Sequence, residues 1–123
     1  PKKLGIKAAS RVALLDAPKG FENTLGPLPQ DVSLHRQARG RFQVVMLFVP
    51  SRQALARRFP TAARAVAEGG RLWLVWPKKS SGRASDLGQN EVRAFGLERG
   101  FVDYKISAID ATWSGLCFAR RKA

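Results

Sequence analysis

The chain has almost no cysteine and almost no histidine. Cys117 is its one cysteine and His35 its one histidine. A single thiol excludes an internal disulfide framework and leaves too few cysteines for a cysteine-based zinc site. Any Ser-His-Asp triad or histidine metal site would have to use His35. No metal-ligand spacing appears in the sequence, which therefore predicts no metal site and a Cys117 that is buried as a small hydrophobic side chain.

Long hydrophobic runs are also absent. No apolar stretch approaches the about 20 residues that a membrane-spanning helix needs, so we expect a soluble, cytoplasmic protein without a membrane partner. The sequence has no P-loop, no recognised nucleic-acid-binding motif, no internal repeat and no linker long enough to divide it. With 45% hydrophobic and 25% charged residues, its composition is globular. The prediction is one domain over residues 1–123.

Acidic residues are scarce. Nine Asp and Glu face 22 Lys and Arg, which gives a formal net charge of +13 over 123 residues. The basic residues are spread along the chain, so the excess is not a basic tail. Such a charge attracts nucleic acid, acidic lipid or anionic metabolites, and it also keeps a protein in solution. Both interpretations, a functional surface and a general solubility effect, stay open at this point.

The pattern of apolar residues predicts strands separated by turns and helices. The run from Phe42 to Val49 is almost continuously apolar, which is typical of a strand buried on both faces of a parallel sheet. Residues 101–109 alternate and lead through a tight turn at Asp110-Ala111 into the last strand, which indicates an antiparallel hairpin. The predicted strands are residues 11–15, 31–34, 42–49, 72–76, 101–109 and 113–119.

Helix signals lie between these strands. Ser51 is a good N-cap for a helix with one apolar face. Pro60 is expected to kink or split that helix, and Gly69-Gly70 to end it. Asp86 with Gln89 forms a capping-box variant that opens a second helix. A single helical turn is expected around residues 22–25.

Strands that alternate with helices indicate parallel pairing through right-handed crossovers. The predicted fold class is therefore α/β, a single three-layer Rossmann-like domain. Its sheet is mostly parallel, with a C-terminal antiparallel hairpin.

Parts of the chain resemble the AdoMet-dependent methyltransferases. The resemblance is carried by Gly69-Gly70 leading into residues 71–75, after the strand 42–49 and its helix, and by the closing helix and hairpin of residues 86–120. The resemblance implies a methyltransferase-like fold that is shortened in its first half. One helix and one strand are missing there or reduced to residues 22–41.

The whole chain also resembles a bacterial family, number 3052 among the domains of unknown function. This narrower resemblance implies a fold and no established activity. The matching stretches are residues 3–7, 11–15, 26–29, 69–73, 76–82, 86–87, 103–105 and 109–116.

Two features depart from the methyltransferase pattern. The turn after the first strand, Asp16 to Gly20, has a single glycine, and the second strand ends in Leu34-His35-Arg36 without the acid that holds the ribose hydroxyls. The sequence therefore predicts no cofactor, with AdoMet disfavoured, and a protein without methyltransferase activity that binds a small anion. The alternatives are sequence-indifferent RNA binding through the basic surface and, second, an AdoMet-dependent methyltransferase.

The candidate ligand-binding residues lie at the carboxyl edge of the predicted sheet, where α/β folds hold ligands. Lys78, Lys79 and Ser81 offer ammonium and hydroxyl groups to a phosphate or carboxylate, although a solvated loop explains them equally well. Asp110 and Trp113 could orient or stack on a planar ligand, or they could serve as a turn residue and a core anchor.

Asp16 completes the predicted ligand-binding set and could form a carboxylate pair with Asp110. No catalytic residue is predicted. For nucleic acid, Trp73 and Trp76 precede Lys78, but their core-like strand is expected to remove both indoles from base stacking.

Overall fold

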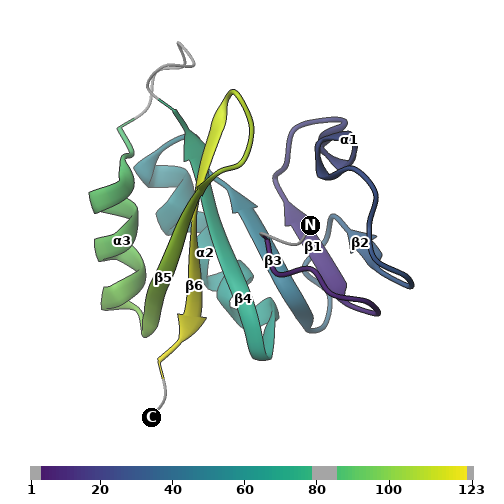
Figure 1. Cartoon of the computed structure of the whole chain (residues 1–123). Helices are drawn as coiled ribbons and strands as arrows, with labels where there is room; N and C mark the ends of the chain where they lie inside the picture. Colours follow the sequence, from purple (N-terminus) through teal and green to yellow (C-terminus); the bar gives the residue numbers. More distant parts are fainter. Residues whose placement is uncertain (1–3, 79–85, 122–123) are drawn as a thin grey trace.

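A computed structural model describes residues 4–78 and 86–121. Its centre is a six-stranded sheet in the order β2-β1-β3-β4-β6-β5 (Figure 1). The strands are β1 (Arg11–Leu15), β2 (Ser33–His35), β3 (Phe42–Phe48), β4 (Val66–Pro77), β5 (Phe101–Ala108) and β6 (Trp113–Arg120), and the helices are α1 (Phe21–Leu25), α2 (Arg52–Ala65) and α3 (Gln89–Glu98).

The strand directions confirm the predicted fold class. β2, β1, β3 and β4 pair in parallel, whereas β6 runs antiparallel to both β4 and β5. β1 is followed directly by the five-residue α1 and the three-residue β2, so the first half is shortened as expected. The chain is thus an α/β domain with a mostly parallel sheet and a C-terminal hairpin.

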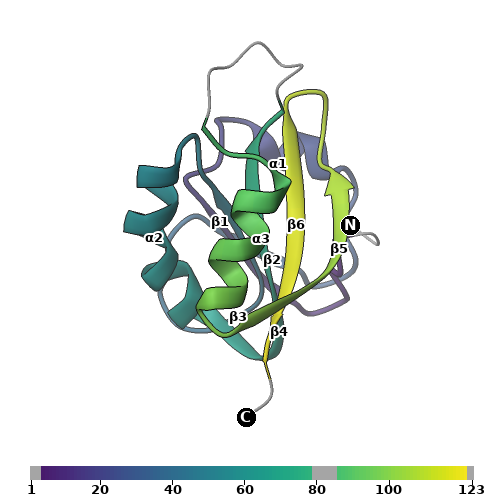
Figure 2. The same cartoon turned by 90° about the vertical axis from the view of Figure 1, so that its left-hand side faces the viewer.

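Two apolar cores, one on each face, make the three layers. α2 and α3 lie side by side over one face (Figure 2), where Leu55, Phe59 and Val92 are buried. On the other face α1 and the N-terminal segment cover the strands. Trp73 is fully buried there, and its Nε1–H donates to the carbonyl oxygen of Leu4 at 3.0 Å. Cys117 is buried in the same core, as predicted.

The start of α2 confirms the predicted cap, but its interior corrects the prediction for Pro60. The Ser51 Oγ accepts the N–H of Ala54 at 3.1 Å. Splitting at Pro60 is wrong, because one helix runs from Arg52 to Ala65 with Pro60 inside it. Pro60 is on the exposed side of the helix, where water can bond the carbonyl that lacks its usual partner.

The predicted helix stop at Gly69-Gly70 is also wrong, because β4 begins directly at Val66 and both glycines lie within it. A Cβ on Gly70 would lie 2.9 Å from the carbonyl oxygens of Ala67 and Gln43, and Gly69 has a φ of 74°. Glycine therefore serves here to let β4 shift its register against β3.

The predicted capping box at Asp86 is wrong as well. α3 begins at Gln89 with Gly88 as its N-cap and no side-chain cap. Asp86 instead holds the start of α2: its Oδ1 accepts the Arg52 N–H at 2.8 Å, and its carbonyl oxygen accepts the Arg52 Nε–H at 3.1 Å. A local motif is thus replaced by a contact between the start of α2 and the segment that precedes α3.

Three apolar side chains of the edge strand β5 are exposed: Val102 at 41%, Tyr104 at 49% and Ile106 at 48%. A register shift between Asp103 and Lys105 interrupts their predicted alternation on one face, so Tyr104 contacts Cys117 whereas Ile106 lies beside Gln89 of α3. α1 lies over the opposite end of the sheet, beside β1 and β2 (Figure 1), and does not cover them. None of the helices in the described ranges is long and apolar enough to cross a membrane.

Candidate functional site

A cavity lies where the order of the strands reverses. From β1 the sheet extends to β2 on one side and to β3 on the other, so the carboxyl ends of β1 and β3 form its switch point. In open α/β sheets this is the position that binds ligands. We name the cavity of about 400 Å³ found there the switch-point cavity; it is lined by Asp16, Pro18, Phe48, Pro50, Ala54, Arg57, Arg58 and Trp113.

The walls of the switch-point cavity combine an acid, guanidinium groups and aromatic rings. Asp16 follows β1 with a φ of 59°, and its Oδ2 accepts the Arg58 Nε–H at 2.8 Å. Phe48, at the end of β3, meets Trp113 edge to face with ring centroids 5.2 Å apart. Hydrogen-bonding groups and apolar walls together are typical of a small-molecule site.

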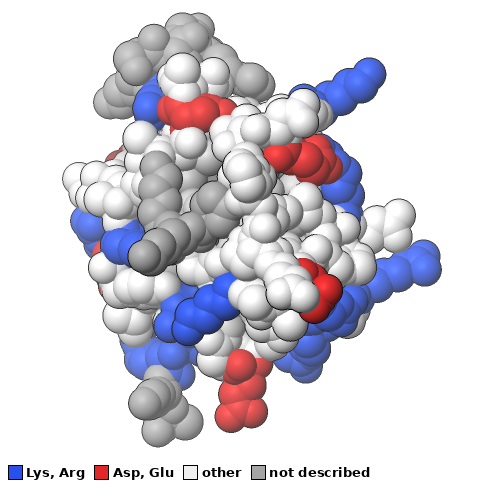
Figure 3. Space-filling view, turned by 45° about the vertical axis from the view of Figure 1, so that its right-hand side comes forward, with Lys and Arg blue, Asp and Glu red and all other residues white. Residues whose placement is uncertain are grey.

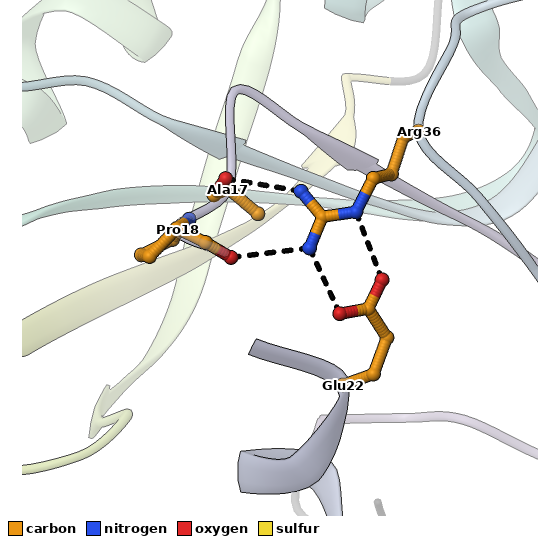
Figure 4. Close-up of polar contacts among 4 residues, drawn as sticks. All are labelled: Ala17, Pro18, Glu22 and Arg36. Atoms are coloured by element: carbon orange, nitrogen blue, oxygen red, sulfur yellow. Dashed lines mark hydrogen bonds and ion pairs between the residues drawn. The ribbon is translucent and has the colours of Figure 1, made fainter. Parts of the chain in front are cut away.

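Arg36 fixes the turn between β1 and α1 (Figure 4). Its Nε–H and Nη2–H donate to the two carboxylate oxygens of Glu22, both at 2.8 Å. The same guanidinium donates to the carbonyl oxygens of Ala17 at 3.0 Å and Pro18 at 3.1 Å. One side chain at the end of β2 therefore holds both α1 and the turn that lines the switch-point cavity.

This fork of hydrogen bonds changes the pKa of both partners. The bonds from Arg36 lower the pKa of Glu22 from 4.5 to about 2, and the Glu22 carboxylate raises the pKa of Arg36. Both side chains are partly exposed, at 41% for Arg36 and 39% for Glu22. The corner beside β2 thus contains a carboxylate, although it comes from α1 and not from the strand end.

Sequence reasoning missed this pair. Glu22 and Arg36 are 14 residues apart, and only the pairing of β2 with β1 brings them together. An arginine in place of the expected acid was the one available signal, since a guanidinium at a strand end needs a partner.

Of the four predicted site residues that the structure describes, two line the same cavity. Asp16 and Trp113 both line the switch-point cavity. Lys78 lines a separate cavity of about 460 Å³ between the end of β4 and the start of α3. Asp110 closes the hairpin turn, because its Oδ1 accepts the N–H of Thr112 at 2.8 Å and of Trp113 at 2.9 Å.

Lys79 and Ser81 lie outside the described residues, so the predicted lysine and serine loop has no structural description. Across residues 4–78 and 86–121, no three His, Cys, Asp or Glu side chains gather as metal ligands. Asp16 has Arg58 as its partner, and Asp110 has the turn N–H groups.

Comparison with known proteins shows which fold this is. No family model matches the chain, and no curated protein matches it. Among solved structures, a SAM-dependent methyltransferase from Thiobacillus denitrificans in complex with S-adenosyl-L-homocysteine matches 98% of this chain and 88% of its own, with a TM-score of 0.63 and 12% identity. The chain has the methyltransferase fold.

Further structures agree with this assignment. The magnesium protoporphyrin IX methyltransferase from Synechocystis with bound SAM matches 98% of this chain and 74% of its own, with a TM-score of 0.58 and 12% identity. The N-methyltransferase NodS from Bradyrhizobium japonicum, in complex with S-adenosyl-L-homocysteine, is also similar. The match covers 92% of this chain and 79% of NodS, with a TM-score of 0.59 and 11% identity.

These likenesses correct two expectations from the sequence. The main functional prediction was a small-anion-binding protein without methyltransferase activity, and the cofactor prediction was that none binds. Both are overturned, because several structures with this methyltransferase fold carry SAM or S-adenosyl-L-homocysteine. Those predictions rested on two features of the sequence: a turn with one glycine and a strand end without an acid. Neither feature prevents the fold from forming.

Proposed function

We propose that the chain binds AdoMet in the switch-point cavity and is an AdoMet-dependent methyltransferase. The observation that carries the proposal is the position of this cavity at the carboxyl ends of β1 and β3, in a sheet with the methyltransferase fold. When bound, AdoMet supplies an electrophilic methyl group on its sulfonium. The residues of this chain bind and orient the cofactor.

The side chains around the cavity fit the groups of AdoMet. Asp16 supplies a carboxylate that can accept from a hydroxyl or amino group, and Arg57 and Arg58 supply guanidinium groups for a carboxylate. The rings of Phe48 and Trp113 suit a planar base or a cationic sulfonium. A volume of about 400 Å³ lies within the usual range for small-molecule sites.

The turn after β1 keeps its shape without a series of glycines. Asp16, with a φ of 59°, and Gly20, with a φ of 80°, supply the left-handed residues. Arg36 holds the intervening carbonyl groups of Ala17 and Pro18. This arrangement supports the proposal because it replaces the glycine-rich turn by a turn braced from β2.

The narrower assignment to family 3052 also belongs to this proposal. Its support is the set of matching stretches, among them residues 76–82 and 109–116. The methyltransferase proposal does not depend on it.

Isothermal titration with AdoMet tests the proposal, and Asp16→Asn is the decisive variant. Asn tolerates the left-handed conformation of residue 16 but removes the charge, so we expect about tenfold weaker binding, as for a lost charge-assisted hydrogen bond. Asp31→Asn is the matched control, because Asp31 has a φ of 60° and does not line the cavity.

Two results would refute the proposal. One is the absence of AdoMet binding up to about 1 mM, the weak limit of specific recognition. The other is equal affinity of the Asp16 and Asp31 variants, which would place any bound AdoMet elsewhere.

A further inference from the structure

The acidic residues neutralise the arginines unevenly. At the carboxyl edge of the sheet, Arg36 pairs with Glu22 and Arg58 with Asp16, each at 2.8 Å. At the opposite, amino edge, arginines donate to backbone carbonyl oxygens instead. We name five of these residues the arginine edge: Arg11, Arg41, Arg71, Arg120 and Arg121.

The carbonyl contacts fix these side chains without cancelling their charge. Arg120 donates to Val66 at 3.0 Å and also to Ala63, at the end of α2, while Arg121 donates to Leu97 in the last turn of α3 at 3.2 Å. Capping a helix end explains such contacts structurally. Each of these contacts uses one or two of the five N–H groups of a guanidinium, and the remaining N–H groups stay available for a ligand.

No member of the arginine edge forms an ion pair with a carboxylate of the described residues. Figure 3 shows Lys and Arg side chains toward the lower end of the molecule, with acidic side chains between them. In Figure 1 this is the end with the C-terminus and the amino ends of the parallel strands. The five arginines themselves are therefore not neutralised by an ion pair, although Glu68 lies on the same edge and Glu98 pairs with Arg99 beside it. Oriented guanidinium groups with uncompensated charge are the usual recognition groups for phosphate.

A groove of about 560 Å³ runs through the arginine edge between the start of β4 and the end of β6. It is lined by Glu68, Gly69, Gly70, Arg71, Arg120 and Arg121, among others. Glu68 is the one acid on its wall. The groove lies at the end of the sheet opposite the switch-point cavity, so the two sites do not share residues.

An exposed aromatic ring adjoins this groove. Tyr104 on β5 is 49% exposed, and the guanidinium carbon of Arg71 lies 5.2 Å from the centre of its ring. The Sγ–H of Cys117 donates to the Tyr104 hydroxyl at 3.1 Å and holds the ring in place. Arg71 thus belongs both to the groove and to the surface around Tyr104.

We propose that the arginine edge and Tyr104 form a binding surface for single-stranded nucleic acid. The guanidinium groups contact phosphates, and Tyr104 stacks on a base, as aromatic residues do in proteins that bind single strands without sequence preference. A duplex keeps its bases stacked and cannot use Tyr104. The proposal stands apart from AdoMet binding, because it uses other residues.

The geometry sets the size of the contact. From β1 through β3 and β4 to β6 there are three strand spacings, about 14 Å in total. At about 3.4 Å per nucleotide, the spacing along a strand with stacked bases, this distance corresponds to about four phosphates. Four phosphate contacts on a single strand predict about 50-fold weaker binding when the salt rises from about 50 to 200 mM.

Fluorescence anisotropy with labelled oligo(U) and oligo(dT) of about 12 nucleotides tests the proposal, with a duplex of the same length for comparison. We expect single strands to bind more tightly than the duplex, with the salt response given above. The RNA and DNA arms identify which backbone is preferred, and either preference supports the proposal. Failure of both single strands to bind at about 50 mM salt would overturn it.

Variants with matched charge locate the surface. The double variant Arg71→Glu, Arg121→Glu should weaken binding of oligo(U) by more than about tenfold at about 50 mM salt. The control Lys7→Glu, Lys19→Glu changes the net charge equally at exposed positions outside the arginine edge, and should weaken binding much less. Equal losses in both variants would mean diffuse attraction by the net charge and would overturn the proposed surface.

Tyr104 variants test stacking. Tyr104→Ala should weaken single-strand binding about tenfold, whereas Tyr104→Phe keeps the ring and should bind like the parent protein. Both are checked for native circular dichroism, and the phenylalanine variant separates loss of the ring from loss of the Cys117 contact. Unchanged affinity of Tyr104→Ala, or affinity for anionic vesicles in place of oligonucleotides, would refute the proposal.

Discussion

Gly96 packs α3 against β6 so closely that even one methyl group does not fit. A Cβ on Gly96 would lie 2.3 Å from Cε2 of Phe118 and 2.8 Å from its Cζ. Phe118 is fully buried among both helices and the sheet, so its ring has no free space to move into. Gly96→Ala therefore has two opposite effects on stability. It improves the helix propensity of α3, and it overpacks the core.

The sizes of these two effects decide whether Gly96→Ala raises or lowers the stability of the protein. Replacing a helical glycine by alanine gains about 1 kcal/mol from propensity. A contact near 2.3 Å must be relieved by shifting the helix or the ring, and overpacking of this kind costs about 1–3 kcal/mol. Because the clash is severe, we expect a net loss of about 1–2 kcal/mol, which lowers the Tm by about 5 °C in a domain of this size.

A double-mutant cycle with Phe118→Leu isolates the clash. The smaller side chain costs about 1 kcal/mol by itself but makes room for the alanine, so the two changes together should cost about 1 kcal/mol less than their sum. Gly100→Ala is the control: its φ of 88° imposes strain, but a Cβ there meets nothing within 4 Å, so it should combine additively with Phe118→Leu. Urea unfolding of the parent, the three single variants and the two double variants measures both combinations. A Gly96→Ala protein as stable as the parent, or an additive cycle, would refute the reasoning.

Two further predictions concern protonation. Burial raises the pKa of Tyr104 from 10.0 to about 12, so its protonated form stabilises the fold below pH 10 and that contribution is lost as the pH rises through about 12. Tyr104 is the single tyrosine, so its tyrosinate absorbance should titrate near 12 in the native protein and near 10 when denatured; coincident curves would contradict this. Because the pKa of Glu22 is lowered, its ionised carboxylate stabilises the fold above pH 4.5. This stabilisation is lost as the pH falls toward about 2. The Tm advantage over Glu22→Gln should therefore persist below pH 4 and vanish near 2, and an advantage that ends near 4.5 would count against the Arg36 pairing.

Much of the fold could be predicted from sequence because its signals are local or periodic. The apolar run of β3 is long enough to require burial on both faces, and the alternation of β5 has the period of a strand. Ser51 caps α2 through a contact three residues away. Such signals need no knowledge of the tertiary structure.

Two of the wrong predictions about local structure involve residues whose partners are distant in sequence. Asp86 suits a local cap but is used by Arg52, 34 residues away, and Gly70 faces the carbonyl of Gln43 on the neighbouring strand. Pro60 kept its helix because the affected side faces water. In each case the neighbouring elements, which the sequence does not reveal, determine the outcome.

The candidate site divides in the same way. Asp16 was predicted because a strand end identifies the ligand edge, and the structure brings it together with Trp113 in the switch-point cavity. The Arg36–Glu22 pair and the arginine edge were not predicted, since the contacts of Arg120 reach more than 50 residues back along the chain. The expectation that AdoMet does not bind rested on the single glycine in the turn after β1 and on the missing acid at the end of β2, and the bracing of that turn by Arg36 could not be read from the sequence.

The central claim is that AdoMet binds in the switch-point cavity. An NMR titration with AdoMet is the most direct test of this binding site, because amide and indole chemical shifts can be followed in a 13.5 kDa protein. We expect saturable shifts concentrated at Asp16 to Gly20, at the start of α2 and at the indole of Trp113. Shifts confined to the groove between β4 and β6, or no shifts at saturating AdoMet, would contradict it.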